Sequence, residues 1–561
     1  MGRNAEAQRE ADEGASVVAL PGVLQKPRLR GYVTALLMLV LIVAAGAVAV
    51  GLGQDANWDL QNYHFYNAWA WLNDRTFDRD IAAAQVQSWH NPLGDLPFYG
   101  MVNAGWDPRV ITFVLAMPAG VAVFFVVRIA WDVFADLHGY DRIGATLAAT
   151  AIGVTASMGV SQLGTTFNEW PGATLIMAAT AIIVRAVVRS AVTLPMWMLV
   201  GAGILAGFAT GLKLTAAPFA VGLCAAVLLR PPPMWGHLRD AFAFAVAVLM
   251  GALLTCGWWG FELWRRFDNP FFPYLNELFG SAWWGDFAVT FRKYGPHSWE
   301  QWIEFPWRLH APSPFFVAEV SYTDWRFAIL YGLALFTLLS AAVERLIDSN
   351  AGDGADRRSQ SAGAALRCLG IFFAVSFVVW TDRYSIVRYT IPLELLSGVL
   401  IVALLRRALQ PALVRTAVLV ATIGLVATTR YPDWWRVPYG ERWFAIHVPP
   451  IEPNSLVVLT SGAPMAYVLP FFPNDARHVG VHNSAVDPRR DTLLLRAAST
   501  AIASHAGPLY ALSYPNWIEQ PDDLSAYRIR KVSRSCVDVR TNMQISPLEL
   551  CRLERAMKDA P

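Results

Sequence analysis

Long apolar runs recur along the chain up to residue 430, and they constrain the fold more than any other feature. A helix that crosses a bilayer needs about 20 mostly apolar residues. Eleven runs meet or approach that length: 32–52, 109–131, 143–160, 170–188, 196–212, 214–230, 239–258, 326–344, 366–381, 387–405 and 412–429. Charged residues make up only 16% of the chain, whereas a soluble domain carries about 25%. The sequence therefore predicts a polytopic α-helical membrane protein with about 11 transmembrane helices.

Clusters of Lys and Arg fall in alternate connecting segments and indicate how the chain is oriented. Short cytoplasmic loops of membrane proteins carry an excess of these residues. Assigning the polar segment 1–30 to the cytoplasm, as a disordered N-terminus, puts every such cluster on the cytoplasmic side. The run that begins at Val33 is then interpreted as an uncleaved signal anchor. The same assignment puts three segments outside the cytoplasm, namely 53–108, 259–325 and 430–561.

The segment 430–561 differs in character from the membrane domain that we assign to residues 31–429. Its residue pattern predicts strands at 454–461, 477–481, 507–514 and 527–541, and helices at 463–472, 490–506 and 546–558. We therefore expect an extracytoplasmic α/β domain of about 130 residues. Cys536 and Cys551 lie in it, and an oxidising compartment favours a disulfide between them. The sequence has no CxxC motif and no Cys/His spacing that is typical of a metal site.

One polar and aromatic stretch directly follows the first span: NWDLQNYHFYNAWAWLNDR, residues 57–75. In a helix, the spacing of Asp59, Tyr63 and Tyr66 puts these residues on one face. The large aromatic residues of the other face suit a helix that lies along the membrane surface. Asp59 then stands near the start of that helix, where an Asp is a favourable cap. The residues alone leave both this capping role and a chemical role for Asp59 open.

The order of this part of the chain resembles the GT-C glycosyltransferases, which use polyprenyl-phosphate-linked sugars. An apolar span, the stretch 57–75 and then QSWHNPLGDLPFY (87–99) lead into the second span, as in the first external loop of that superfamily. Asn91 stands where those proteins often have a Pro. The resemblance implies that Asp59 is the catalytic base that removes the proton of the acceptor hydroxyl. For that task we expect a carboxylate whose pKa is raised by a partly apolar cleft.

Two further charged residues fit the same chemistry by their place in the chain. Glu169 lies in the second external loop, SQLGTTFNEWPGA, where the resemblance implies a second catalytic carboxylate that positions an acceptor or a metal. The alternative is an ordinary Glu in the first turn of a helix, favoured by the helix dipole. Lys213 lies at the outer junction of two apolar runs, where a Lys is costly and indicates substrate binding unless it snorkels to the surface.

Other candidates for substrate contacts lie in the outer segments. In TDRYSIVRYTIPLE (381–394), we expect Arg383 and Arg388 to lie near the donor phosphate. The guanidinium of Arg is able to donate two parallel hydrogen bonds to the oxygens of one phosphate. The alternative role for Arg388 is an ion pair that holds helices together. Arg388 and Glu394 face nearly opposite directions on one helix, so each needs a partner elsewhere. The remaining candidate substrate-binding residues are Tyr63, His64, His90 and His310.

These features favour a membrane glycosyltransferase that moves a hexosyl or pentosyl group from a polyprenyl-phosphate donor to an extracytoplasmic glycan, lipid or protein of the cell envelope. The resemblance implies a bacterial cytoplasmic membrane, with the C-terminal domain in the periplasm. A polysaccharide polymerase or ligase, or a transporter or flippase, is the alternative, although no internal repeat typical of transporters is evident. We expect the external segments to lack a DxD motif, so a divalent metal is compatible but not indicated. The net charge of +2 gives no reason to expect a nucleic-acid partner.

Overall fold

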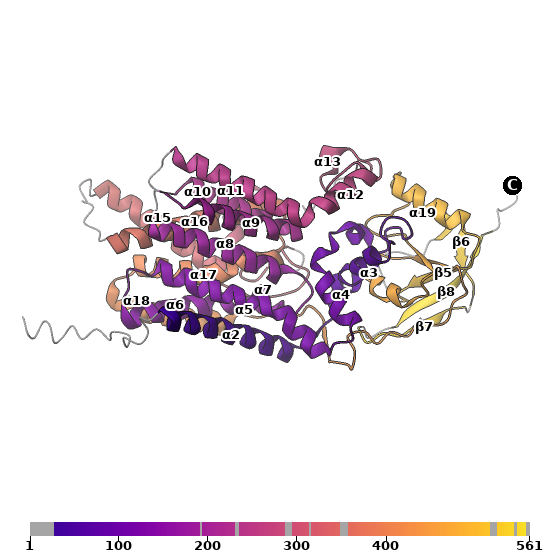
Figure 1. Cartoon of the computed structure of the whole chain (residues 1–561), viewed down its shortest axis with the longest axis horizontal. Helices are drawn as coiled ribbons and strands as arrows, with labels where there is room; N and C mark the ends of the chain where they lie inside the picture. Colours follow the sequence, from indigo (N-terminus) through magenta and orange to yellow (C-terminus); the bar gives the residue numbers. More distant parts are fainter. Residues whose placement is uncertain are drawn as a thin grey trace, which may run out of the picture.

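The structure is a computed structural model of the 561-residue chain. It describes residues 27–190, 193–230, 235–286, 294–312, 316–347, 357–515, 524–533, 535–543 and 547–556. A bundle of long helices forms one end of the elongated molecule, and a smaller domain built on a β-sheet forms the other end (Figure 1). Of the polar N-terminal segment, residues 1–26 lie outside the described residues. Helix α2 (Pro27–Leu52) begins earlier than the predicted boundary at residue 31.

Each of the eleven predicted spans is helical in the structure. The helices are α2, α5 (Pro108–Val133), α6 (Gly139–Val154), α8 (Glu169–Arg189), α9 (Met196–Leu212), α10 (Ala217–Leu228), α11 (Gly236–Ala252), α15 (Arg326–Ile347), α16 (Arg357–Arg383), α17 (Ile391–Ala408) and α18 (Pro411–Thr428). Among the described residues, seven helical stretches are long and apolar enough to cross a membrane, by length and composition, and α9, α10 and α15 are shorter apolar helices. The predicted fold class, a polytopic helical membrane protein with a C-terminal sheet domain, is confirmed. Its orientation and its cellular membrane stay predictions.

Helix α17 forms the centre of the bundle. Its residues from Ile391 to Ala403 are buried, and α5, α6, α8, α15, α16 and α18 pack around it. Glycines allow the closest approach to α6, because a Cβ at Gly153 or at Gly398 would collide with backbone atoms of the facing helix. Small residues at such contacts are typical of membrane helices. This packing fixes the start of α17 at the end of the bundle that faces the sheet domain (Figure 1).

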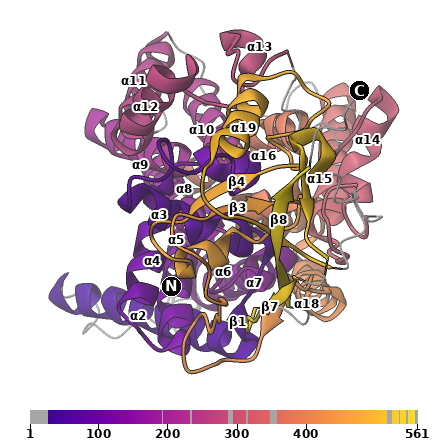
Figure 2. The same cartoon turned by 90° about the vertical axis from the view of Figure 1, so that its right-hand side faces the viewer.

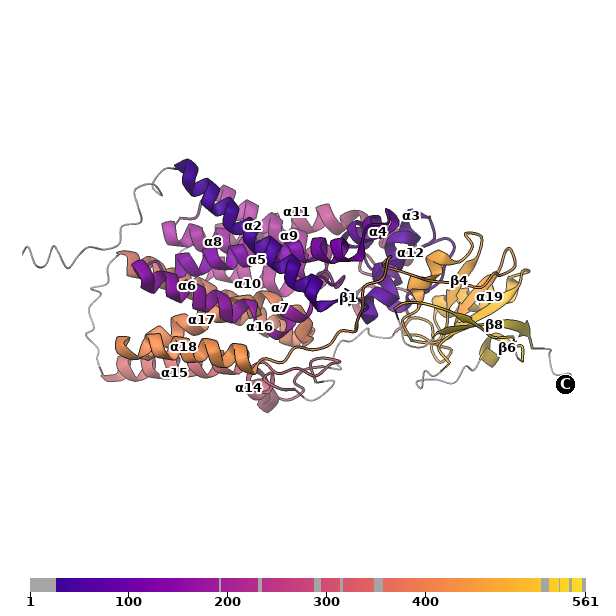
Figure 3. The same ribbon diagram turned by 90° about the horizontal axis from the view of Figure 1, so that it is seen from below.

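Short elements lie between the long helices of the bundle. They are η2 (Leu60–His64, a π-helix), α3 (Tyr66–Leu72), η3 (Gln85–Trp89), η4 (Pro92–Gly94), α4 (Leu96–Asn103), α7 (Ser157–Ser161), η5 (Leu214–Ala216), η6 (Leu253–Gly257), α12 (Trp258–Phe267), α13 (Asn276–Phe279), α14 (Trp299–Arg308) and η7 (Val387–Thr390). Helices α11 and α12 form one helical run from Gly236 to Phe267 that extends toward the sheet domain (Figure 1). Helix α14 also lies at that end of the bundle (Figure 3).

The C-terminal domain is a mixed sheet with strand order β4-β3-β5-β8-β6, and β7 also pairs with β8. Its elements are β3 (Leu456–Leu459), η8 (Ala466–Phe471), β4 (Arg477–Gly480), α19 (Leu493–Ser504), β5 (Leu509–Ser513), η9 (Leu524–Tyr527), β6 (Ile529–Lys531), β7 (Val537–Val539) and β8 (Leu548–Arg555). Strand β3 runs parallel to β4 and β5, whereas β8 runs antiparallel to its neighbours. A two-stranded ribbon of β1 (Gln54–Asp55) and β2 (Arg436–Val437) ties the end of α2 to the start of this domain.

The helix predicted at residues 546–558 is wrong, because the described part of this segment is strand β8. Leu548, Leu550 and Leu553 are buried in the sheet, and β8 pairs with β5, β6 and β7. The Leu, Glu and Arg residues of this segment favour a helix by propensity, but the pairing with other strands outweighs that preference. The helix predicted at 463–472 is present as the shorter 3-10 helix η8.

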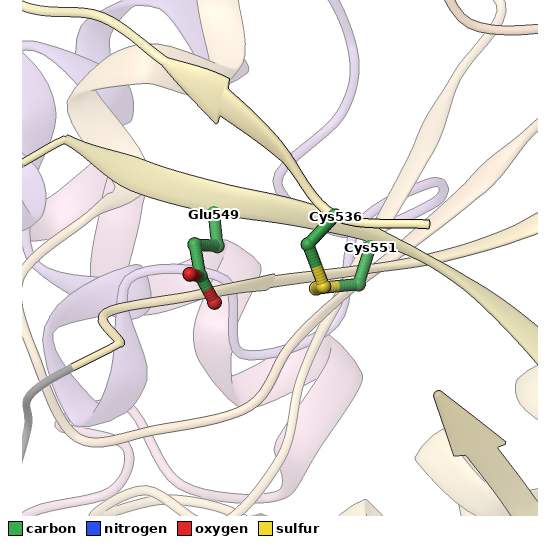
Figure 4. Close-up of side chains that lie close together, drawn as sticks. All are labelled: Cys536, Glu549 and Cys551. Atoms are coloured by element: carbon green, nitrogen blue, oxygen red, sulfur yellow. A yellow bond between two sulfur atoms is a disulfide. The ribbon is translucent and has the colours of Figure 1, made fainter. Parts of the chain in front are cut away.

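A disulfide joins Cys536 to Cys551 across the edge of β8 (Figure 4). Cys551 lies on β8, and Cys536 directly precedes β7, which pairs with β8. Glu549 lies close to both sulfur atoms (Figure 4). Because the disulfide leaves no thiolate, the three residues do not form a metal site in this state.

Candidate active site

The stretch that follows the first span is buried beneath the sheet domain. Every residue from Asp59 to Ala70 is buried. The ring of Phe65 lies 4.5 Å from that of Phe444, and Ile81 forms an isolated β-bridge with Val479 of strand β4. Figure 2, which views the molecule from the sheet-domain end, shows α3 behind strands β3 and β4. The predicted helix along the membrane surface is therefore wrong, because these aromatic residues form the core between the first loop and the domain.

Asp59 stands immediately before η2, and its side chain points into the protein. It makes no capping hydrogen bond to the backbone of η2. One carboxylate oxygen accepts a hydrogen bond from the hydroxyl of Tyr63 at 3.2 Å and lies 3.4 Å from Nη1 of Arg388. The structure therefore gives Asp59 a charged partner from η7, the short helix that precedes α17, and the capping role is not the one observed.

A second ion pair lies beside the first. The ammonium group of Lys213 pairs with Glu169 and donates a hydrogen bond to the Phe167 carbonyl at 2.7 Å. It also lies 5.4 Å from the centre of the Tyr389 ring, and the guanidinium of Arg388 lies 5.3 Å from the same ring. The ring of Tyr389 thus joins the two cations into one site. This Asp59 cluster consists of Asp59, Glu169, Lys213, Arg388 and Tyr389.

Other contacts hold Arg388 and Glu394 apart. The backbone carbonyl of Arg388 accepts a hydrogen bond from the Gln162 side chain at 2.9 Å. Glu394 accepts backbone hydrogen bonds from Met158 and Gly159 at the start of α7. The two residues therefore have separate partners, as predicted, although Arg388 lies on η7 and Glu394 on α17.

Tyr63, His64 and His90 form one wall of the site. The ring of Tyr63 lies 4.1 Å from that of His64 and 5.0 Å from that of His90. His90 is hydrogen-bonded through Nε2 to the hydroxyl of Tyr274 at 2.7 Å. Burial and the charge of Lys213 lower the pKa of His90 to about 3, so this residue is neutral near pH 7.

A buried carboxylate orients His64. Nδ1 of His64 lies 2.6 Å from one carboxylate oxygen of Asp95, and that oxygen also accepts a hydrogen bond from the Asn168 side chain. Asn168 adopts a left-handed backbone conformation with φ of 63° directly before Glu169. Asp95 therefore connects the first loop, which carries Asp59, to the second loop, which carries Glu169.

The electrostatics of the site keep Asp59 ionised. Burial raises the pKa of Asp59, but the neighbouring Arg388, His64 and Lys213 together lower it by more, so its pKa lies below the ordinary value. The expectation of a raised pKa is therefore wrong for the structure as it stands, because the neighbouring cations outweigh the apolar surroundings. Near pH 7, Asp59 is a carboxylate that is able to accept a proton.

Two predicted residues lie away from the cluster. His310 is hydrogen-bonded to the carbonyl of Trp307, and its ring stacks on Trp325 at 4.0 Å. Arg383 pairs with Asp382 at 2.9 Å, and 74% of its side chain is exposed. Among the interactions of the described residues, neither His310 nor Arg383 contacts a member of the Asp59 cluster.

A narrow pocket opens beside the cluster on the side of the cations. It is lined by Asn168, Glu169, Lys213, Phe219, Tyr389 and Pro392, among others. Its free volume is about 10 Å³, about the space that one water needs. The side chains of Arg388 and Lys213 are 15% and 18% exposed, whereas that of Asp59 is 5% exposed. A ligand that reaches the cluster therefore meets the cations before the carboxylate of Asp59.

The expectation that the external segments lack a DxD motif is wrong, because Asp78, Arg79 and Asp80 have this spacing in the first loop. Their carboxylates already have cationic partners. Asp80 is bonded to Arg75 through both oxygens, and Asp78 pairs with Arg266 at 2.8 Å. This motif therefore offers no free pair of carboxylates to a metal ion in this structure.

Several residues of the site do not stand out in the sequence. Tyr389 directly follows Arg388, and Asn168 directly precedes Glu169. In the sequence, only these charged neighbours indicate that Tyr389 and Asn168 belong to the site. Asp95 lies within QSWHNPLGDLPFY, but its partner His64 lies a whole loop earlier. Tyr274 comes from the distant segment between α12 and α13. These four residues are recognised only once the chain is folded.

No family model matches the chain, and no curated protein matches it in sequence. Among solved structures, it is similar to ArnT from Cupriavidus metallidurans bound to undecaprenyl phosphate, with 12% identity, a TM-score of 0.45 and coverage of 96% of this chain and 100% of that one.

It is also similar to the oligosaccharyltransferase of Archaeoglobus fulgidus in its apo form, with 13% identity, a TM-score of 0.43 and coverage of 85% of this chain and 69% of that one. Both similarities concern the fold alone. At this low identity, the roles of individual residues are inferred from the geometry of this chain alone.

Proposed function

We propose that this chain is a membrane glycosyltransferase that moves a sugar from a polyprenyl-phosphate donor to an acceptor hydroxyl outside the cytoplasm. The observation that carries the proposal is the pairing of Asp59 with Arg388, beside Lys213 and Glu169, where the helical bundle meets the sheet domain. A base and two cations that lie side by side are the groups that transfer from a lipid phosphate requires.

The cations are the proposed binding site for the donor phosphate. A polyprenyl phosphate leaves as an anion, so it needs stabilisation by positive charge more than it needs a general acid. Nε of Arg388 is buried and has no hydrogen-bond partner among the described residues. Arg388 therefore has a donor to spare for a phosphate oxygen, in addition to the Nη1 that faces Asp59.

The bond changes follow from this placement. The carboxylate of Asp59 takes the proton of the acceptor hydroxyl while the hydroxyl oxygen bonds to the anomeric carbon of the donor sugar. The bond from that carbon to the phosphate oxygen breaks, and its electron pair leaves with the polyprenyl phosphate. Tyr63, which donates a hydrogen bond to Asp59, holds the carboxylate in place for this step.

Donor binding is also expected to strengthen the base. In the structure, Arg388 lowers the pKa of Asp59, whereas burial raises it. A phosphate that engages Arg388 adds negative charge beside Asp59, so the balance moves toward a higher pKa. Asp59 is then a better proton acceptor in the donor complex than in the free protein.

The proposal is tested with the purified full chain in lipid nanodiscs and radiolabelled sugars linked to polyprenyl monophosphate. The expected result is the release of polyprenyl phosphate that depends on an added acceptor and is absent in Asp59→Asn. Parallel reactions contain a diphosphate-linked glycan. Consumption of that donor alone, or flux of the lipid across sealed vesicles without any transfer product, would instead favour a polymerase or a flippase.

A further inference from the structure

A second cavity lies between the segment that leads into α14 and the end of α16. Its volume is about 190 Å³. A cavity of about 150 Å³ is enough for a benzene-sized ligand inside a protein. The cavity therefore has room for one six-membered ring with a few substituents and is too small for a polyprenyl chain.

Aromatic rings and polar groups share the walls of this cavity. The rings belong to Tyr294, Trp302 and Tyr384, and the polar side chains include His297 and Asp382. Ring faces carry partial negative charge and attract the polarised C–H groups of an apposed ring. A ligand with one flat C–H face and several hydroxyls at its edge, as in a sugar, complements both kinds of wall.

The charges on the wall are already balanced. Asp382 and Arg383 form an ion pair at 2.9 Å, and both line the cavity. A carboxylate beside the guanidinium repels a phosphate, whereas the pair offers both an acceptor and donors to neighbouring hydroxyls. The cavity therefore suits a neutral polyol better than an anion.

Thr381 supplies an independent sign of a missing polar ligand. It lines the cavity, is 4% exposed, and its hydroxyl has no hydrogen-bond partner among the described residues. Other helical threonines of this chain, such as Thr337 and Thr422, donate to the carbonyl four residues earlier. A buried hydroxyl without a partner is costly, and the hydroxyl of a bound ligand would remove that cost.

The cavity adjoins the Asp59 cluster. The hydroxyl of Tyr384 donates to the carbonyl of Leu214, the residue after Lys213, at 3.1 Å. The ring of Tyr384 also meets the ring of Tyr389 edge-on, with centroids 5.9 Å apart. One aromatic wall thus separates this cavity from the two cations.

We propose that this cavity binds one neutral sugar ring, and that this ring belongs to the acceptor. The assignment to the acceptor rests on the proposed function, whereas sugar binding by the cavity does not. A sugar held here lies beside the site of the donor phosphate, with Tyr384 and Tyr389 between the two.

Saturation-transfer NMR on the full chain in nanodiscs tests this inference, with the methyl pyranosides of glucose, galactose, mannose and N-acetylglucosamine as probes. At least one probe is expected to bind, and Trp302→Ala and Thr381→Val are expected to weaken its binding about tenfold. Thr381→Val removes a hydroxyl that makes no internal hydrogen bond, so this variant is expected to fold. Trp307→Ala is the matched control, because Trp307 lies on the same helix, is 52% exposed and does not line the cavity.

Binding by Asp59→Asn separates this inference from the proposed function. That variant is expected to keep full affinity for the glycoside, so a failure of transfer leaves the sugar site standing. The inference is overturned if none of the four glycosides binds, if Trp302→Ala and Thr381→Val bind like the wild type, or if inorganic phosphate displaces the glycoside.

Discussion

Two buried groups of charged residues, both next to the sheet domain, differ in how completely the hydrogen bonds of their guanidinium are satisfied. In the Arg75 cluster, defined here as Arg75, Asp80 and His478, the guanidinium bonds both oxygens of Asp80 and also donates to the carbonyls of Asn474 and Ala476. In the Asp59 cluster, Arg388 makes two contacts of 3.4 Å, to Asp59 and to the hydroxyl of Tyr389.

The difference separates a structural role from a chemical one. The Arg75 cluster joins the first loop to β4, it is almost fully excluded from solvent, and its guanidinium has no capacity left for a ligand. The Asp59 cluster has an unpartnered Nε on Arg388 and a narrow pocket beside Lys213. A buried ion pair that is fully bonded holds two parts of a protein together, whereas an incompletely bonded one retains capacity for a charged substrate.

The largest effect on stability is expected from Arg75→Met. This change leaves the Asp80 carboxylate without its guanidinium partner, which costs about 3–5 kcal/mol for a buried pair. Thermal unfolding of the detergent-purified chain measures the loss. Arg79→Met is the control, because Arg79 makes one exposed side-chain contact, to the carbonyl of Asp475, and is expected to change the midpoint little. A small shift in Arg75→Met would remove the distinction between the clusters.

Arg388→Gln is expected to act on binding more than on folding. It removes a charged donor to phosphate, so the affinity for polyprenyl phosphate should fall roughly 10- to 100-fold. Titration of the lipid into nanodisc samples, followed by a change in intrinsic fluorescence, measures this affinity. Arg383→Gln is the control and should bind the lipid like the wild type, because Arg383 lies outside the Asp59 cluster. Equal loss in both variants would show that the effect is general surface charge.

Acid should weaken the Arg75 cluster in a defined pH range. Burial raises the pKa of Asp80, but His478 and Arg75 outweigh it and lower the pKa from 3.8 to about 2. A carboxyl group whose pKa is lower in the folded than in the unfolded protein stabilises the fold when the pH is above its unfolded-state pKa. This stabilisation is lost as the pH falls through its folded-state pKa. The loss is about 2 kcal/mol between pH 4 and pH 2. Melting midpoints of Asp80→Asn should lack this component, and identical pH profiles in both proteins would contradict it.

The smallest effect is expected from Glu169→Gln, and its sign is informative. Glu169 pairs with Lys213, so it competes with a donor phosphate for the same ammonium group. Removal of this charge should tighten the binding of polyprenyl phosphate by roughly two- to fivefold, the range of a partly exposed ion pair. The same fluorescence titration measures it. Weaker binding in this variant would show that Glu169 supports the phosphate site and does not compete with it.

The sequence predicts the helices well because each apolar run is long enough for a helix whose surface is buried in a bilayer or in the bundle. It fails for the first loop because Trp, Tyr and Phe are equally typical of a membrane surface and of a protein core. It fails for β8 because Leu548 to Arg555 has helical propensity, while the strand partners lie far away in sequence.

The candidate site, too, is predictable from the sequence only in part. Asp59, Glu169, Lys213 and Arg388 can be found one by one, since a charged residue next to an apolar span is costly. That they form two adjacent ion pairs cannot be predicted, because the partners come from four separate segments. The lowered pKa of Asp59 depends on those pairs, which explains why the expectation of a raised pKa was wrong.

The most direct test of the central claim measures donor binding and sugar transfer in the same sample of Asp59→Asn. The account predicts that this variant binds polyprenyl phosphate at least as tightly as the wild type, because Arg388 no longer has a competing carboxylate. Transfer in a single turnover should fall by about 10²–10⁴-fold, the usual loss for a missing general base. Transfer at the wild-type rate by a variant that still binds the lipid would contradict the account.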